Sequence, residues 1–152
     1  MQPTPQPVYL VPQTVNRPAQ MMSFGDSIKT VFSKFVDFSG RASRSEFWWF
    51  TLFSSCASIV LGVFDGFILV IADVPLDSVL WMLSPMSTLF SLIVILPSLG
   101  VAVRRLHDSG KSGWSIFIVL VPCVGIILYF IWLIQEGEPH DNMYGAVPTN
   151  II

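Results

Sequence analysis

The chain has 152 residues, of which 53% are hydrophobic and 12% charged, and its formal net charge is -2. A soluble domain of this length has too little interior to bury so much apolar surface, whereas lipid-facing side chains need no protein cover. The composition therefore excludes an ordinary soluble domain and predicts an all-α integral membrane protein, with no nucleic-acid partner expected.

The first segment, residues 1–21, is rich in proline and glutamine. Proline favours extended chain and removes hydrogen-bond donors, so we expect a disordered tail. A membrane domain over 22–145 follows, and residues 146–152 are expected to be a second flexible tail.

An amphipathic helix is predicted from Ser23 to Phe38. Apolar side chains recur there at intervals of three and four, and Ser23 with Asp26 resembles a helix-capping pair. Such a helix just before a membrane span is typical of one lying in the membrane interface. Packing of its apolar face on the helix bundle is compatible with that position.

The first span is expected over about 48–70. Ser43-Arg44-Ser45-Glu46 matches the S-x-x-E capping box, and Trp48 and Trp49 suit the headgroup region. Asp65 interrupts the apolar run, and Asp at the centre of a span costs about 2.5–3.5 kcal/mol. We therefore expect Asp65 near the far interface or facing the bundle interior.

Two further spans are expected over about 79–103 and 113–134. The second contains no charged residue, and Pro85 and Pro97 lie within it; the third contains Pro122. Proline is tolerated in membrane helices when neighbours satisfy the freed carbonyl groups. The predicted fold is thus a bundle of three transmembrane helices plus the N-terminal amphipathic helix.

The positions of the basic residues predict the orientation. No Lys or Arg lies between the first two expected spans or after the third. The positive-inside rule then predicts a multi-pass protein of the bacterial inner (plasma) membrane, with a cytoplasmic N-terminus and an extracytoplasmic C-terminus. The eight basic residues are Arg17, Lys29, Lys34, Arg41, Arg44, Arg104, Arg105 and Lys111.

This topology brings two polar segments, 40–48 and 104–114, to the cytoplasmic face. Arginine forms bidentate pairs with carboxylates, so Glu46 can pair with Arg104 or Arg105. Asp108 can likewise pair with Arg41 or Arg44, and such pairs would fix how the helices meet. The candidate cytoplasmic-face cluster comprises Arg41, Arg44, Glu46, Arg104, Arg105, His107, Asp108 and Lys111.

The same segments resemble a known family. The pattern F-x-G-R-x-x-R-x-E-[FYW]-W over Phe38–Trp48, then R-R-L-H-D with a downstream Trp, is similar to the YhaH-type bacterial inner-membrane proteins called domain of unknown function 805. The ending G-x-x-x-x-N-x-[YF]-G, from Gly137 to Gly145, also matches. The resemblance implies small polytopic inner-membrane proteins without an established activity.

Specific chemistries find little support. Gly110-Lys111-Ser112 ends like a phosphate-binding loop, but Arg105 stands where the first glycine is required. His107 and Asp108 are neighbours that point about 100° apart on a helix, and they lack further ligands. We therefore expect no catalytic residue, metal or cofactor, and Cys56 and Cys123 are interpreted as small buried hydrophobes.

The preferred functional hypothesis is a non-enzymatic structural or accessory membrane protein, acting with a protein partner or as a homo-oligomer. One alternative is a component of an oligomeric channel or transporter, for which Asp65 is the candidate path residue. Another is a protein that binds anionic lipids through its basic cluster, or that modifies lipids.

Overall fold

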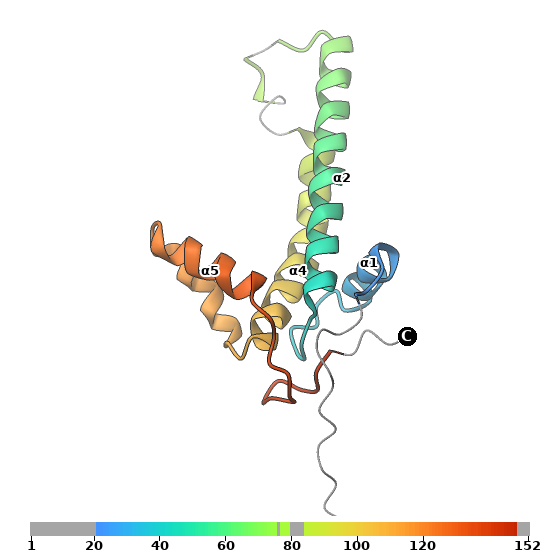
Figure 1. The fold of residues 1–152 in the computed structure, drawn as a ribbon. Coiled ribbons are helices and arrows are strands. Elements are labelled where there is room, and N and C mark those ends of the chain that lie inside the picture. The colour runs from blue at the N-terminus through green and yellow to red at the C-terminus, as the bar shows by residue number, and fades with distance from the viewer. Residues whose placement is uncertain (1–20, 76, 80–83, 149–152) are drawn as a thin grey trace, which may run out of the picture.

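Two long antiparallel helices form the stem of the molecule (Figure 1). The computed structural model describes residues 21–75, 77–79 and 84–148, and among these every regular element is helical, as predicted. The elements are α1 (Phe24–Ser33), α2 (Arg44–Ile71), α4 (Pro85–Asp108), the 3-10 helix η1 (Gly113–Leu120) and α5 (Val124–Ile134). The expected tail over residues 1–21 lies almost wholly outside the described residues.

The stem helices α2 and α4 are long and apolar enough to cross a bilayer, judged by length and composition. Their 28 and 24 residues give lengths of about 42 and 36 Å, against a hydrocarbon core of about 30 Å. The predicted capping box begins α2, where the Ser43 hydroxyl accepts from the Glu46 amide at 3.2 Å. Pro85 begins α4, at a position where a backbone amide would find no acceptor within the helix.

Asp65 lies in α2 and faces the start of α4. It is only 3% exposed. Its two carboxylate oxygens accept from the amides of Met86 at 3.0 Å and Ser87 at 2.9 Å. The first amides of a helix have no partner within the helix, so Asp65 supplies acceptors that α4 itself lacks.

Helix α1 ends five residues earlier than expected, at Ser33. Ser23 caps it as predicted, accepting from the Asp26 amide at 3.2 Å. Beyond Ser33, the Asp37 side chain accepts from the Ser39 amide at 2.9 Å. This local bond stabilises a turn in the segment that follows the helix.

Aromatic side chains dock α1 on α2. Phe24 meets Trp49 edge to face with 5.7 Å between ring centroids, and Phe32 meets Phe50 at 5.5 Å. The hydrophobic core therefore lies at this end of the stem, where α1, α2, α4 and α5 converge. Its buried members are Val31, Ala42, Phe47, Phe50, Val94, Val101, Ala102 and Leu133.

The single continuous span expected over 113–134 is not what the structure shows. Helices η1 and α5 are separated by a turn at Val121–Cys123 and form an apolar hairpin (Figure 1). Pro122 disfavours a helical conformation for Val121, whose φ and ψ are -84° and 111°. Gly125 then permits close contact between the arms, because a Cβ there would lie 1.8 Å from the Ile118 carbonyl oxygen.

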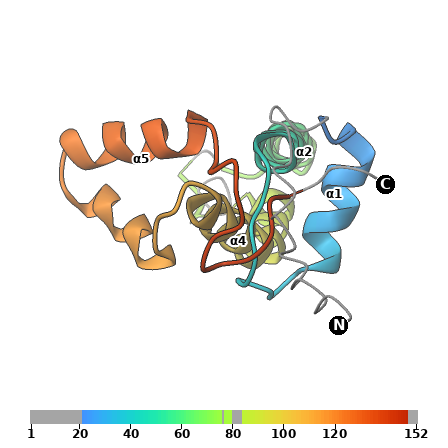
Figure 2. The same ribbon diagram turned by 60° about the horizontal axis from the view of Figure 1, so that its bottom comes forward.

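Because the hairpin turns back, the chain after it returns to the end of the stem where α1 lies (Figure 2). Residues 135–147 pack beside segment 40–46, at the same end of the stem as α1. The predicted sides of the two termini relative to the membrane stay a prediction. The charge pattern carried no information on this point, because no Lys or Arg follows Lys111.

Candidate functional site

The predicted polar cluster lies where segment 40–43 crosses the last turn of α4. Gly40, with φ of 78°, allows the turn that leads into this segment. The Ala42 amide then donates to the Arg104 carbonyl oxygen at 3.0 Å. This contact sets Arg41 and Glu46 beside the polar end of α4.

Asp108 is the centre of the cluster. Its Oδ1 lies 2.8 Å from Arg41 Nη2 and 2.9 Å from Arg41 Nε, and its Oδ2 pairs with Arg105 Nη1. The three side chains are at most 1% exposed. One carboxylate thus pairs with two guanidinium groups in a site closed to solvent.

A second buried pair joins α2 to α4. Arg104 Nη2 lies 2.9 Å from Glu46 Oε1, and Arg104 Nη1 donates to the Asp37 carbonyl oxygen at 2.7 Å. Arg104 therefore also holds the segment that follows α1. The Asp37 carboxyl itself accepts from the Ser39 hydroxyl and amide, and these hydrogen bonds lower its pKa.

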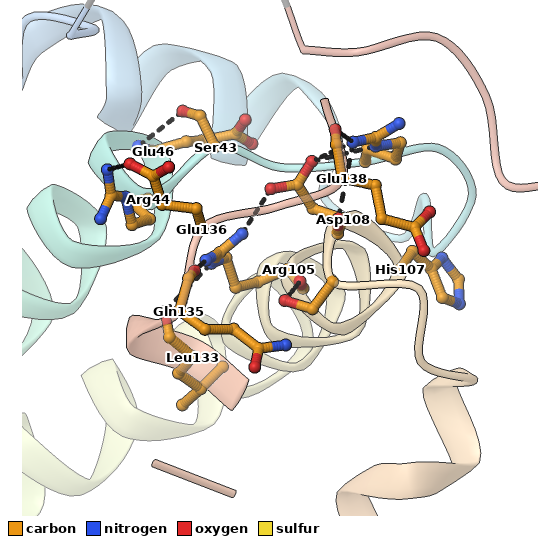
Figure 3. Close-up of polar contacts among 12 residues, drawn as sticks. Ser43, Arg44, Glu46, Arg105, His107, Asp108, Leu133, Gln135, Glu136 and Glu138 are labelled. Atoms are coloured by element: carbon orange, nitrogen blue, oxygen red, sulfur yellow. Dashed lines mark hydrogen bonds and ion pairs between the residues drawn. The ribbon is translucent and has the colours of Figure 1, made fainter. Parts of the chain in front are cut away.

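The remaining donors of the arginines bind the chain that leaves the hairpin (Figure 3). Arg105 Nε donates to the Leu133 carbonyl oxygen at 3.1 Å, and Arg105 Nη2 donates to that of Gln135. The Ser109 hydroxyl donates to the Trp132 carbonyl oxygen at 3.0 Å. Together these groups satisfy carbonyls at the end of α5 that the helix cannot satisfy itself.

Arg41 binds the next part of the same segment. Its Nη2 and Nη1 donate to the carbonyl oxygens of Glu138 and His140, each at 2.7 Å. The Glu138 amide donates in turn to the Asp108 carbonyl oxygen at 2.8 Å. Residues 133–140 are therefore held to the stem mainly through backbone carbonyl groups.

Three buried cations face two buried carboxylates, so one positive charge is in excess. The carbonyl dipoles around Arg41 and Arg105, together with the negative end of α4, offset it. Within the part of the chain that the structure describes, Arg104 Nε is the one buried side-chain nitrogen or oxygen without a partner.

His107 lies at the edge of the cluster. Its Nδ1 is 3.1 Å from the Gly40 carbonyl oxygen, and its ring stacks on Tyr144 with 3.9 Å between centroids. Asn142 Nδ2 donates to the His107 carbonyl oxygen at 3.0 Å and to Glu138 Oε2 at 2.7 Å. His107 thus contacts protein groups on two sides.

Two predicted members lie outside the buried cluster. Arg44 pairs with Glu136 at 2.9 Å, and both side chains are largely exposed. Lys111 Nζ lies 5.8 Å from the ring centroid of Trp132. Among residues 21–75, 77–79 and 84–148, no three His, Cys, Asp or Glu side chains gather as metal ligands would.

Sequence reasoning missed the contribution of residues 133–145. The spacing of Gly137, Asn142, Tyr144 and Gly145 was a signal, but the predicted topology placed these residues across the membrane. The acceptors are backbone carbonyl groups, which every residue has, so no pattern of residue types could have identified them.

The comparisons with known proteins agree with the helical membrane character of the chain. A family model described as protein of unknown function, DUF805, matches residues 35–146. Inner membrane protein YhaI of Escherichia coli K12 is 32% identical over 119 residues, covering 78% of this chain and 92% of that protein. Inner membrane protein YhaH of the same strain is 30% identical over 122 residues, with the same coverage. No solved structure matches.

Proposed function

Because the chain belongs to the DUF805 family, whose relatives YhaI and YhaH are named inner membrane proteins, we propose that it is a non-catalytic structural component of that membrane. In this proposal α2 and α4 are the two spans, and the η1–α5 hairpin is re-entrant. The buried arginines lock the hairpin and residues 135–147 to the cytoplasmic end of the stem.

The observation that carries the proposal is the occupation of the buried guanidinium groups by protein. Arg41, Arg104 and Arg105 are each held by a carboxylate and by at least one backbone carbonyl. These buried groups are bound mainly by protein acceptors, which leaves little access for a substrate or a lipid phosphate. The three arginines instead join segments that lie far apart in the sequence.

The length of the hairpin arms supports the re-entrant topology. The eight residues of η1 and the eleven of α5 correspond to about 16 Å each, half the thickness of the hydrocarbon core. Both arms are apolar, and irregular backbone is tolerated in a membrane where protein groups satisfy it. Arg105 and Ser109 do this at the end of α5.

The positive-inside rule supports a cytoplasmic location for the arginine-rich end. In the described residues, all Lys and Arg lie in α1 or directly after it, in segment 41–44, at the end of α4 or at residue 111. Helix α1 and residues 135–147 both lie at that end, so both termini are proposed to be cytoplasmic.

The alternatives receive less support from the geometry. Asp65, the candidate path residue of a channel, is occupied as an acceptor for the first amides of α4. A lipid-headgroup site would have to use exposed cations such as Lys29 and Arg44 rather than the buried arginines.

Reporter fusions in bacteria test the proposed topology. A reporter that is active only in the cytoplasm is joined to the N-terminus, after Ile152, or into the loop at Asp73. We expect activity from both terminal fusions and none from the loop fusion. A matched set carrying a reporter that is active only outside the cytoplasm should give the reverse pattern, and an extracytoplasmic C-terminus would refute the re-entrant hairpin.

A further inference from the structure

The two ends of the molecule differ in width. Figures 1 and 2 show α1 on one side of the stem and the η1–α5 hairpin on the other, both at the arginine-rich end. Toward Ile71, α2 and α4 stand alone among the described helices. The cross-section therefore widens from two helices to five elements along the stem.

The hairpin presents apolar side chains outward along both arms. Exposed side chains of this kind include Phe117, Leu120, Ile127, Phe130, Ile131 and Ile134. Arms of about 16 Å reach roughly half the hydrocarbon core, so these side chains occupy one leaflet. The hairpin thus adds volume among the lipid chains of the cytoplasmic leaflet without adding any to the other.

On the opposite side, α1 adds to the same leaflet. Val31 and Ser27 are fully buried against the stem, while Phe24 is 45% exposed beside them and Lys29 is exposed on the polar face. Its apolar face packs on the stem, so α1 widens the molecule at this end.

The attachments that hold both flanks are short and buried. Arg105 binds the carbonyl end of α5, and Arg104 binds the segment after α1 through the Asp37 carbonyl oxygen. Gly113, at the start of η1, lies so close to α4 that a Cβ there would be 2.8 Å from Val103. These contacts hold both flanks at the arginine-rich end of the stem.

We propose that the chain is a rigid wedge that favours membrane whose cytoplasmic leaflet is convex. The inference rests on the proposed re-entrant topology. A body wider in one leaflet fits best where that leaflet is expanded, so the free energy of insertion differs between the two senses of curvature. The partner of this surface is the lipid chains of that leaflet, independent of any headgroup.

Reconstitution into vesicles of two sizes tests the wedge. The full chain, with a distinct cleavable tag at each terminus, is inserted into small sonicated and large extruded vesicles of one neutral lipid as detergent is slowly withdrawn. Protease added outside then measures the fraction of each tag that faces out. We expect about a threefold excess of outward-facing tags in small vesicles, a free-energy difference near one RT, and no excess in large ones.

Paired variants separate the wedge from general hydrophobicity. Phe117 and Phe130 on the hairpin are 55% and 49% exposed, and Phe64 and Phe67 at the far end of α2 are 52% and 62% exposed. Replacing Phe117 and Phe130 with Ala makes the wide end smaller and should reduce the excess of outward-facing tags in small vesicles. Replacing Phe64 and Phe67 with Ala makes the narrow end smaller and should preserve or increase that excess.

Each outcome bears on one proposal. If single molecules lose one tag and keep the other, as the size of the products shows, the termini lie on opposite sides and the re-entrant topology fails. If each molecule loses both tags or neither, with no excess of doubly cleaved molecules in small vesicles, the topology stands and the wedge is refuted. Equal effects of the two variant pairs would also refute the wedge.

Discussion

At the residue scale, the chemistry of arginine explains why the buried cations are not lysines. Arg41 uses three nitrogens to bind a carboxylate oxygen and two carbonyl oxygens that point from different parts of the chain. The planar guanidinium fork can serve several acceptors at once, whereas an ammonium group is a compact point charge. One side chain thereby joins segment 40–46 to both α4 and residues 138–140.

Asp108→Asn tests the centre of the cluster. The substitution removes the carboxylate that pairs with Arg41 and Arg105 and leaves their charges buried without it. We expect a loss of about 3–5 kcal/mol in the free energy of unfolding, measured by chemical unfolding in mixed micelles.

The exposed pair provides the control for this substitution. Glu136→Gln breaks the Arg44–Glu136 pair at the surface. An exposed pair contributes about 0–1 kcal/mol, so the control should unfold almost as the parent does. Similar losses in both variants would show that burial of the cluster has no special role.

The arginine and carboxylate residues of the cluster could be identified from the sequence, but only the structure shows which arginine pairs with which carboxylate. Glu46 had two candidate arginines, adjacent in sequence, and adjacent residues on a helix point about 100° apart. Arg104 faces α2 and the end of α1, while Arg105 faces α5. Only the placement of those helices decides which arginine meets Glu46.

At the element scale, hydrophobic periodicity and capping residues predicted the stem well and the hairpin poorly. Ser43 with Glu46 marked the start of α2, because the chemistry of a cap is local. The run over 113–134 has the length of a span, and its total hydrophobicity does not show whether Pro122 kinks a helix or ends it. Close packing at Gly125, a tertiary contact, accompanies the break.

Gly125→Ala tests the hairpin turn. The added Cβ would lie 1.8 Å from the Ile118 carbonyl oxygen, so the two arms must separate. We expect a loss of about 1–3 kcal/mol in unfolding free energy, as for other overpacked sites. Amide hydrogen exchange should also become faster in α5.

Gly66→Ala is the matched control within α2. No atom lies within 4 Å of a Cβ placed there, and Ala favours a helix over Gly by about 1 kcal/mol. This variant should be as stable as the parent or more so. If Gly125→Ala behaved in the same way, the tight turn would be disproved.

At the scale of the whole molecule, charge placement predicts that the arginine-rich end faces the cytoplasm, but it carries no information on the side of the C-terminal segment. Basic residues mark a side only where they occur, and residues 112–152 contain none. The side of the membrane on which the C-terminal segment lies therefore depends on whether residues 113–134 cross the bilayer. That in turn depends on the turn at Val121–Cys123 and on the arginine donors that bind the carbonyl groups at the end of α5.

Truncation after Ile134 tests the contribution of the C-terminal segment. It removes the Glu138 and His140 carbonyls that bind Arg41, and charge-assisted hydrogen bonds are worth about 1.5–3 kcal/mol each. We expect α2 and α4 still to insert, with an unfolding free energy lower by about 3 kcal/mol or more. Truncation after Val147 retains these contacts and should leave the free energy of unfolding unchanged. Equal stability of the two truncated proteins would contradict a stabilising role of residues 135–147.

The bond between Arg41 and His140 spans 99 positions of the chain, and this separation has a consequence for biogenesis. Chains are synthesised from the N-terminus at about 5–20 residues per second, so Arg41 leaves the ribosome several seconds before its acceptors exist. During that interval a guanidinium destined for burial must remain hydrated at the membrane surface. Closure of the cluster therefore waits for the synthesis of His140, 99 positions after Arg41.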